Sequence, residues 1–249
     1  TLTNITFFLS EDIASGRIEW GGTGSGGESL LEFFDLTAEA ARIGTHESDT
    51  YVIPDLVDGG NYSITISGTD PAGNEALPVS ITDYLVDRTP PEFSELFPIS
   101  DSYINSEEIG FTVSEDLASG RVTFSGKNAF SAELTGSELK EGTFPQGHIS
   151  NMRNLSDGEV YSVSIVGKDF AGNESEVTES VNILYDISPP ELTVLEPEDG
   201  SFITVSDVTI SLNEHLAEGS LAWISSEGAE SRIALDSLQL QKGRHVITG

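Results

Sequence analysis

The chain contains the same sequence motifs two or three times, at a nearly constant spacing. The segment Phe111–Phe124 repeats Phe7–Trp20, and Ser211–Trp223 resembles both. The motif Asp-x-Ala-Gly-Asn begins at Asp70 and again at Asp169, 99 positions later. A unit of this length can form a domain with its own hydrophobic core, whereas solenoid repeats are only about 20–45 residues long. The repeats therefore predict a series of similar domains.

A second repeated motif, Asp-x-Thr/Ser-Pro-Pro, marks the expected domain boundaries. It begins at Asp87 and at Asp186, again 99 positions apart. We expect three domains, at residues 1–87, 88–186 and 187–249. Compared with the second copy, the first is expected to lack its opening strand and the third to lack its last strands. The Pro-Pro pairs predict short linkers with extended, polyproline-like geometry.

The strand signals in each copy indicate the fold class. Tyr62–Ile66 and Tyr161–Ile165 alternate apolar and small polar residues, which is the period of a half-buried strand. Short strands separated by Gly, Pro, Asn and Asp are typical of all-β sandwiches. We therefore predict an all-β fold of tandem immunoglobulin-like, Greek-key β-sandwich domains joined by short Pro-Pro linkers. The other strands expected in the second copy are Glu92–Phe97, Ser102–Asn105, Glu108–Ser114, Arg121–Ser125, Ala129–Leu134, Gly147–Met152 and Val177–Tyr185.

Recurrent aromatic residues support this prediction. Tyr62 and Tyr161 each follow a leucine and an Asp-Gly turn, which is the layout of the tyrosine corner of Greek-key sandwiches. Trp20, Phe124 and Trp223 occupy equivalent positions on the expected third strand of each copy. A large aromatic residue at this position is the usual core anchor of such a sandwich. We expect all three to be core residues.

Each copy also predicts one helical turn in the crossover between its two sheets. The turn is ended by a glycine, which can adopt the left-handed conformation common after a helix. Two of the copies have the spacing of a capping box, in which side chain and backbone bond each other reciprocally. The expected turns lie at 36–42, 134–140 and 235–241, the boxes at Thr135/Glu138 and Asp236/Gln239, and the glycines at Gly44, Gly142 and Gly243.

The motifs Ser-Glu-Asp-Leu-Ala-Ser-Gly, Asp-x-Ala-Gly-Asn and Asp-x-Thr/Ser-Pro-Pro resemble the tandem bacterial immunoglobulin-like repeats of very large surface proteins and adhesins. The resemblance covers essentially the whole chain. It implies an extracellular stalk or adhesive array, on the bacterial cell surface or secreted, and often rigidified by calcium at domain junctions. The implied partners are neighbouring repeats of the same chain, other copies, or a surface receptor.

Acidic residues are expected to gather at one end of the second domain. Strand direction alternates in this kind of sandwich, so the loop after the second strand, the loop after the sixth strand and the incoming linker share one end. Carboxylate, amide and carbonyl oxygens are the ligands that Ca²⁺ takes, six to eight at a time. We therefore predict a calcium site at the first junction. Its candidate ligands are Asp87, Glu115, Asp116, Asp169 and Asn173.

The other copies offer weaker candidates. The first copy has the equivalent loop residues without a linker carboxylate, and the second junction has His215 in place of the second loop acid. A second interpretation stays open, because Asp-x-Ala-Gly-Asn also suits a plain hairpin turn and the acidic loops suit solvent. The weaker candidates are Glu11, Asp12, Asp70 and Asn74 in the first copy, and Asp186 and Glu214 at the second junction.

Composition excludes several other classes of function. The chain has 42 acidic against 11 basic residues, a formal net charge of −31. This charge argues against nucleic acid as a partner, since phosphate binding needs clustered Lys and Arg. No run of about 18 apolar residues is present to insert directly into a membrane. There is no cysteine, so neither disulfides nor thiolate metal sites can form.

Nothing in the sequence indicates an enzyme. The four histidines do not recur at equivalent positions, and no nucleophile elbow, phosphate loop or zinc-protease motif is present. We therefore expect a non-enzymatic extracellular stalk or adhesion segment. Two alternatives remain: a structural filament or sheath subunit, and a carbohydrate-binding or accessory region of a secreted enzyme. An exposed cluster of aromatic side chains would favour the second alternative.

Overall fold

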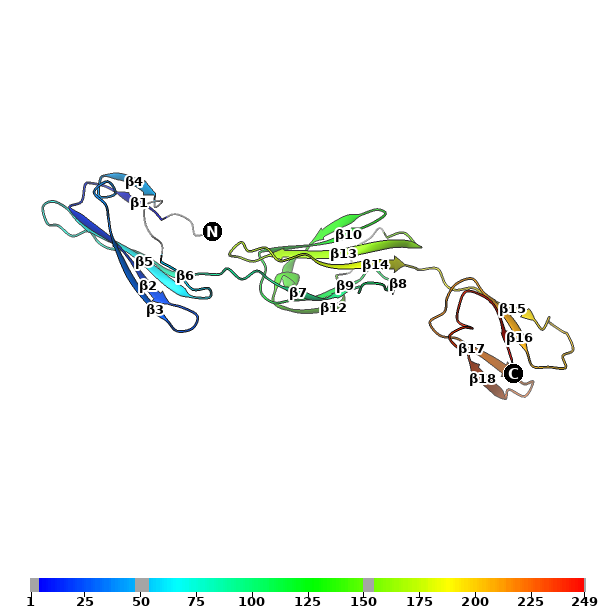
Figure 1. Cartoon of the computed structure of the whole chain (residues 1–249). Helices are drawn as coiled ribbons and strands as arrows, with labels where there is room; N and C mark the ends of the chain where they lie inside the picture. The colour runs from blue at the N-terminus through cyan, green and yellow to red at the C-terminus, as the bar shows by residue number, and fades with distance from the viewer. Residues whose placement is uncertain (1–4, 48–53, 150–154, 249) are drawn as a thin grey trace. The chain divides into compact units, whose positions relative to one another are not determined.

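The computed structural model describes residues 5–47, 54–149 and 155–248 (Figure 1). Within these residues the regular elements are β-strands and one short 3-10 helix, η1 (Gly136–Leu139). The all-β prediction is thus confirmed. No helix in the described ranges has the length and apolar character that crossing a membrane requires.

The chain divides into two compact units. The first comprises Thr1–Ser102, Glu107–Leu155 and Val160–Leu184, and the second comprises Tyr103–Ser106, Ser156–Glu159 and Tyr185–Gly249. The first unit contains the first repeat and most of the second. The division into three domains at residues 87 and 186 stays a prediction.

The second repeat is a two-sheet sandwich. One sheet has the order β12-β9-β7, and the other contains the order β11-β10-β13-β14. The chain passes from β9 to the other sheet at β10 and returns at β12, which is the predicted Greek-key pattern. The strands are β7 (Phe93–Phe97), β9 (Ile109–Val113), β10 (Ser119–Ser125), β11 (Phe130–Glu133), β12 (Gly142–Ile149), β13 (Glu159–Lys168) and β14 (Thr178–Tyr185). The last three residues of the strand expected at Gly147–Met152 lie outside the described ranges, and β12 begins five residues before it.

The core of this sandwich follows from alternation along its strands. In β13 the residues Tyr161, Val163 and Ile165 are buried while those between them are partly exposed. Phe124 is fully buried, which confirms it as the core aromatic residue of this repeat. A Cβ on Gly167 would lie 2.9 Å from Cζ of Phe93. The glycine therefore allows β7 and β13, from opposite sheets, to pack closely.

The first repeat has most of the same strands. Its sheets are β3-β2-β5-β6 and β1-β4, the counterparts of β11-β10-β13-β14 and β9-β12. Trp20 is buried in its core. The Tyr62 hydroxyl accepts a hydrogen bond of 2.9 Å from the Val57 backbone N–H, so the tyrosine corner is confirmed in this repeat. The strands are β1 (Thr6–Leu9), β2 (Ser15–Thr23), β3 (Ser29–Asp35), β4 (Gly44–Glu47), β5 (Asn61–Thr69) and β6 (Val79–Leu85).

The second unit contains the third repeat, with sheets β15-β16-β19 and β17-β18. Val208, Ile210 and Leu212 of β16 are buried in its core, and Trp223 packs partly buried against them. Trp223 therefore lies at the expected core position, but it is more exposed than Trp20 and Phe124. The strands of this repeat are β15 (Leu192–Glu196), β16 (Val208–Leu212), β17 (Ser220–Ile224), β18 (Glu230–Ala234) and β19 (Gly243–Ile247). The short strand β8 (Tyr103–Ile104) belongs to the second repeat's sequence.

The crossover turns form as predicted, although only the second is a 3-10 helix among the described residues. In the third repeat, Asp236 and Gln239 bond each other's backbone N–H through their side chains, both at 2.9 Å. In the second repeat, Glu138 Oε2 accepts the Thr135 N–H at 2.7 Å. The following glycines have φ of 133°, 146° and 128° at Gly44, Gly142 and Gly243. These values explain why glycine recurs there, because other residues rarely adopt them.

Candidate cation site at the first junction

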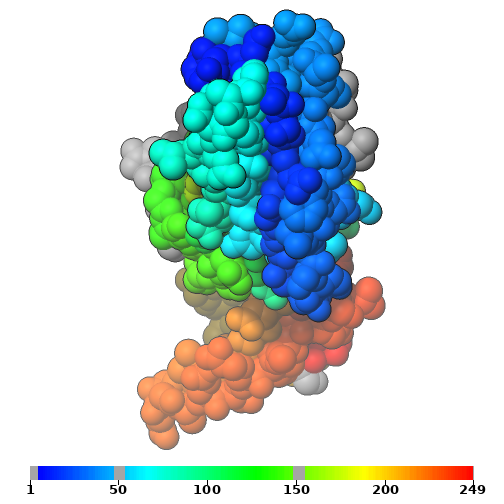
Figure 2. Space-filling view, turned by 90° about the vertical axis from the view of Figure 1, so that its left-hand side faces the viewer, coloured from blue at the N-terminus to red at the C-terminus, as the bar shows by residue number. Residues whose placement is uncertain are grey.

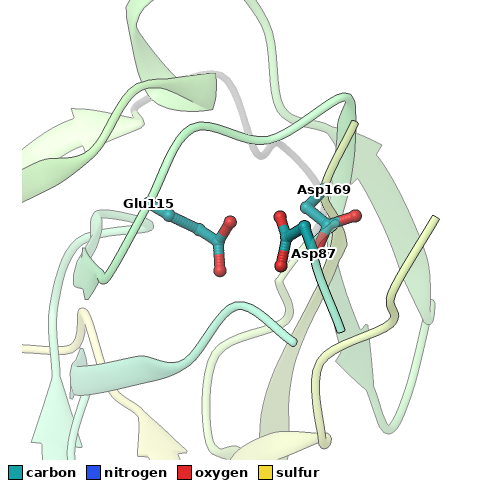
Figure 3. Close-up of side chains that lie close together, drawn as sticks. All are labelled: Asp87, Glu115 and Asp169. Carbon is teal, nitrogen blue, oxygen red and sulfur yellow. The ribbon is translucent and has the colours of Figure 1, made fainter. Parts of the chain in front are cut away.

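Three carboxylates converge where the linker enters the second repeat. Asp87 follows β6, Glu115 lies in the loop between β9 and β10, and Asp169 comes directly after β13. One oxygen from each lies within 4.8 Å of the other two. Figure 3 shows the Glu115 carboxylate pointing toward those of Asp87 and Asp169. Three of the five ligands predicted for the first junction are therefore brought together.

Asp169 is held in place by its own turn and is only 2 % exposed. Its Oδ1 accepts the backbone N–H groups of Gly172 and Asn173, at 2.7 and 2.9 Å. Its Oδ2 accepts Asn173 Nδ2 at 2.8 Å, and the same amide donates to the Asp87 carbonyl at 3.1 Å. Asn173 thus joins the turn to the linker, and the turn holds a buried carboxylate next to Asp87.

The local electrostatics disfavour three charged carboxylates at this point. Burial raises the pKa of Glu115 above its ordinary value, and the neighbouring charges of Asp87, Asp169 and Glu141 raise it further. Like charges at this separation favour protonation of one group. A bound cation would remove that penalty, because it favours the charged form of each ligand.

The residues present fit a calcium ion in part. The three side chains offer carboxylate oxygens, the ligand type that Ca²⁺ prefers, and each carboxylate can bind through one or two atoms. The two Asp169 oxygens already accept hydrogen bonds, but each oxygen has two lone pairs. Three carboxylates leave part of a six- to eight-fold coordination to water.

Asp116 does not belong to this group. Its Oδ2 pairs with Lys140 Nζ at 2.7 Å, and its Oδ1 accepts the Glu141 N–H at 2.9 Å. The hydrogen bonds from Lys140 and then Glu141 hold the pKa of Asp116 below its ordinary value. Asp116 therefore fastens its loop to the end of the crossover turn.

The other copies use the same position in the same way. Asp12 accepts the Ile43 N–H at 2.8 Å, and Nδ1 of His215 accepts the Lys242 N–H at 3.2 Å. The shared requirement is a hydrogen-bond acceptor, which an imidazole nitrogen also supplies. This explains why histidine replaces the acid in the third copy.

The first-repeat turn has almost the same bonds, but among the described residues it lies in no group of three acids. Asp70 Oδ1 accepts the Ala72 and Asn74 N–H groups, both at 2.8 Å, and its Oδ2 accepts Asn74 Nδ2 at 2.7 Å. The Asn74 side chain and then its backbone hold the Asp70 pKa below its ordinary value. Glu11 is exposed in the preceding loop. Within the described ranges, neither residue joins a group of three metal-binding side chains.

The second junction shows no such group in the part of the chain that the structure describes. Asp186 Oδ1 accepts the Ser188 N–H at 3.1 Å, just as Asp87 Oδ1 accepts the Thr89 N–H at 3.1 Å. Glu214 is partly exposed. The recurrent linker aspartate therefore has a local structural role whether or not other acids are nearby.

One pair of linker contacts was not predicted from the sequence. Asp58 accepts hydrogen bonds from the Arg88 N–H and, at 2.6 Å, from the Thr89 hydroxyl. The Thr89 bond and then the Arg88 bond hold the Asp58 pKa below its ordinary value. The turn before the tyrosine corner is thereby fastened to the linker.

The same contact recurs 99 positions later. Asp157 accepts the Ile187 N–H at 2.8 Å and the Ser188 hydroxyl at 2.6 Å, and the Ser188 bond is the main cause of its lowered pKa. The signal in the sequence is the double recurrence of an Asp-Gly turn and a Thr/Ser two residues after the linker aspartate. We call these two contacts, Asp58–Thr89 and Asp157–Ser188, the linker clamps.

Comparison with known proteins gives a family for part of the chain. Residues 145–241 match the family described as bacterial Ig-like domain (group 3). The matched segment is slightly shorter than one repeat period and runs from the second repeat into the third. No curated protein matches the chain.

Two solved structures align with nearly the whole chain at low identity. One is a tetra-tandem repeat in the extending region of a large adhesion protein, with 16% identity and a TM-score of 0.34, covering 99% of this chain and 61% of that one. The other is chicken CNTN1 FN1-FN3 domains, with 12% identity and a TM-score of 0.32, covering 98% of this chain and 86% of that one. The fold assignment rests on the sheets described above and on the family match. The resemblance to bacterial immunoglobulin-like repeats is therefore confirmed over residues 145–241.

Proposed function

We propose that this chain is a non-enzymatic segment of an extracellular bacterial stalk or adhesive array, with a calcium site at its first junction. The observation that carries the proposal is the convergence of Asp87, Glu115 and Asp169 on a linker between immunoglobulin-like repeats. A cation there would bridge linker and sandwich, and so would restrict the linker. A stalk that transmits force requires linkers whose motion is restricted.

The acidity of the chain supports the same proposal. A net charge of −31 favours solubility and attracts cations. Extracellular modules bind calcium with Kd on the order of 10⁻⁴–10⁻³ M, so calcium at millimolar concentration would occupy half or more of the sites. At lower concentrations the acidic groups repel each other and the linker is held by hydrogen bonds alone.

Calorimetric titration of the full chain with CaCl₂ tests the metal site. We expect one site per chain, with affinity reduced at least tenfold by Glu115→Gln, because the variant loses a charged ligand and keeps the side-chain size. Glu11→Gln, at the equivalent position of the first repeat, is the matched control and is expected to bind calcium like the unaltered chain. Equal affinity in both variants, or no heat at all, would refute the site.

Small-angle X-ray scattering tests the mechanical part of the proposal. We expect the distribution of interatomic distances to narrow when calcium is added and to broaden with chelator. The Glu115→Gln variant should give the broader distribution under both conditions. An identical scattering profile with and without calcium, in a chain that binds the ion, would leave a metal site without a role in stiffening.

A further inference from the structure

The strand β3 lies at an edge of the first repeat. It is the first strand of the sheet β3-β2-β5-β6 and, among the described residues, pairs with β2 alone. Figure 2 shows the cyan segment of β5 and β6 on one side of this repeat and the blue segment of β2 and β3 on the other. In the second repeat the equivalent strand, β11, is also at the end of its sheet, although the opening strands β7 and β8 are present there. The free edge at β3 is therefore a property of the fold and does not depend on those strands.

The edges of the second repeat carry the protection that natural sheets use, which includes short strands, charges, proline and bulges. β11 has four residues, and its exposed residues are Ser131 and Glu133. β12 contains Pro145 and a register shift, and β7 contains a register shift as well. By contrast β3 has seven residues, contains neither proline nor lysine, and pairs with β2 without a register shift. Of these edges, β3 is the one suited to pairing with another strand.

Large apolar side chains are exposed on the outer face of β3. Leu31 is 61% exposed and Phe33 47%. The pairing registers place Ser131 of the second repeat and Arg232 of the third at the position of Phe33. The third repeat has Glu230 at the position of Leu31. The first repeat thus has apolar residues where its relatives in the chain have polar or charged ones, and an exposed apolar edge of this kind favours association.

Backbone hydrogen bonds at the two ends of β3 show which of its residues have groups facing outward. The Leu36 N–H donates to the Gly16 carbonyl at 2.8 Å, and the Gly24 N–H donates to the Glu28 carbonyl at 2.7 Å. In an antiparallel pair, residues bonded to the partner strand alternate with residues whose N–H and C=O point away from it. Even-numbered residues of β3 therefore bond to β2. The residues with outward-facing backbone groups are Ser29, Leu31, Phe33 and Asp35.

The sequence of β3 is symmetric in chemical type about its central residue. It reads Ser-Leu-Leu-Glu-Phe-Phe-Asp, so two apolar residues and then a polar one follow Glu32 in each direction. In an antiparallel pair of two β3 strands centred on Glu32, Leu31 lies opposite Phe33 on the outer face. On the other face Leu30 lies opposite Phe34. The residues with outward-facing backbone groups also face each other in this register, so the edge is complementary to itself, as a two-fold interface requires.

We propose that β3 binds the β3 strand of a second copy of this chain, antiparallel and related by a two-fold axis at Glu32. Addition of a strand to a sheet edge gives affinity through backbone hydrogen bonds and specificity through alternate side chains. The pairing continues the sheet from one copy into the other and covers Leu31 and Phe33. It joins separate chains side by side, which goes beyond the stalk function proposed above and does not require calcium.

Glu32 limits the strength of this association. In the two-fold register the two Glu32 side chains are direct cross-strand neighbours, and like charges in that position are destabilising. The net charge of −31 on each chain adds repulsion, which salt screens beyond about 8 Å at physiological ionic strength. A single edge contact with this repulsion gives weak, reversible pairing, and many copies on one surface would strengthen it through multivalency.

Sedimentation velocity of the full chain, in chelator and about 0.15 M salt, tests the proposal. We expect a reversible equilibrium between monomer and dimer. Leu31→Lys and Phe33→Lys should each weaken the dimer roughly tenfold, because each substitution enters the two-fold interface twice. Ile81→Lys is the matched control, since Ile81 is 58% exposed on β6, at the other end of the same sheet. All three sites are exposed, so the variants should keep the circular dichroism of the unaltered chain.

Substitutions of Glu32 test the register. Glu32→Gln should tighten the dimer roughly threefold, because the repulsion between the two carboxylates is removed. An equimolar mixture of Glu32→Lys and the unaltered chain should associate more tightly than either protein alone, because an ammonium then faces a carboxylate. In hydrogen exchange, the Leu31 and Phe33 amides should gain protection as the concentration rises. The Glu32 amide should not change, since it already bonds to β2.

Four outcomes would overturn the proposal. The first two are no dimer up to millimolar chain, and a dimer that Leu31→Lys and Phe33→Lys leave unchanged. A dimer that Ile81→Lys abolishes instead would move the contact to the other end of the sheet. Growth beyond the dimer would exclude the two-fold pairing, because a two-fold interface closes on itself. The measurements are made in chelator, so their outcome is separate from that of the calcium site.

Discussion

The two Asp-x-Ala-Gly-Asn turns have almost the same internal hydrogen bonds and very different surroundings. In both, one aspartate oxygen accepts backbone N–H groups of the turn and the other accepts the asparagine amide. Asp169 is buried beside Asp87 and Glu115, whereas Asp70 is partly exposed and belongs to no such group in the described residues.

The comparison distinguishes two roles that the sequence motif alone does not distinguish. One is to form the turn, and the other is to contribute a carboxylate to a group of acids. The hydrogen bonds of the turn lie within the motif itself, which supports the hairpin interpretation for both copies. The grouping of acids depends also on the linker and on the loop after β9, and within the described residues it is found at the second copy. A metal proposal for the first copy therefore has no support from the motif itself.

The largest effect is expected from removing the buried aspartate. Asp169→Ala should lower the free energy for opening the second repeat by roughly 2 kcal/mol, because two partly buried hydrogen bonds to a charged acceptor are lost. Asp70→Ala should have a smaller effect on the first repeat, where water can replace the carboxylate. Hydrogen exchange of the β13 and β5 amides measures the two repeats separately. Equal losses in both repeats would show that burial of the turn does not matter.

Calcium should increase the difference in stability between the second repeat and the first. At a free concentration ten times Kd, a single site stabilises the state that binds it by about 1.4 kcal/mol. We expect this gain in the β13 amides and not in the β5 amides, since only the second repeat contains the group of three acids. The gain should disappear in Asp87→Asn, whereas Asp186→Asn at the second junction leaves it unchanged. Stabilisation of both repeats alike would indicate weak binding to acidic surface in general.

The recurrent core was predictable because comparing copies reveals it. Trp20 and Phe124 recur on one strand, and burial follows from their size and the strand period. The direction of the strands predicted that Asp87, Glu115 and Asp169 would lie at the same end of the sandwich. The position of Asp116 was not predictable, because the sequence does not show that a loop acid faces Lys140 and Glu141 rather than the junction. The linker clamps were missed since Asp58 and Asp157 also fit a plain turn before the tyrosine.

The linker clamps give a pH dependence with a definite sign. The folded-state pKa of Asp58 and that of Asp157 are lowered, chiefly by Thr89 and Ser188. Their contribution is therefore complete above the ordinary aspartate pKa of about 3.9 and is lost as pH falls through the lowered value. Carboxyl carbon NMR titration should show the Asp58 pKa rising in Thr89→Val, with Asp157 unchanged. Ser188→Ala should give the reverse, and an unshifted Asp58 in Thr89→Val would remove the hydroxyl as the cause.

The smallest effect concerns the acceptor that fastens the loop after the second strand. Asp116 accepts the Glu141 N–H in the second repeat, and His215 accepts the Lys242 N–H in the third. Removing the acceptor should therefore expose the facing amide in each repeat. His215→Ala should speed hydrogen exchange of the Lys242 amide, and Asp116→Ala should do the same for the Glu141 amide. His215→Asp supplies another acceptor and should keep the Lys242 amide protected. Fast exchange of Lys242 in His215→Asp, or slow exchange in His215→Ala, would show that the third repeat does not rely on this bond.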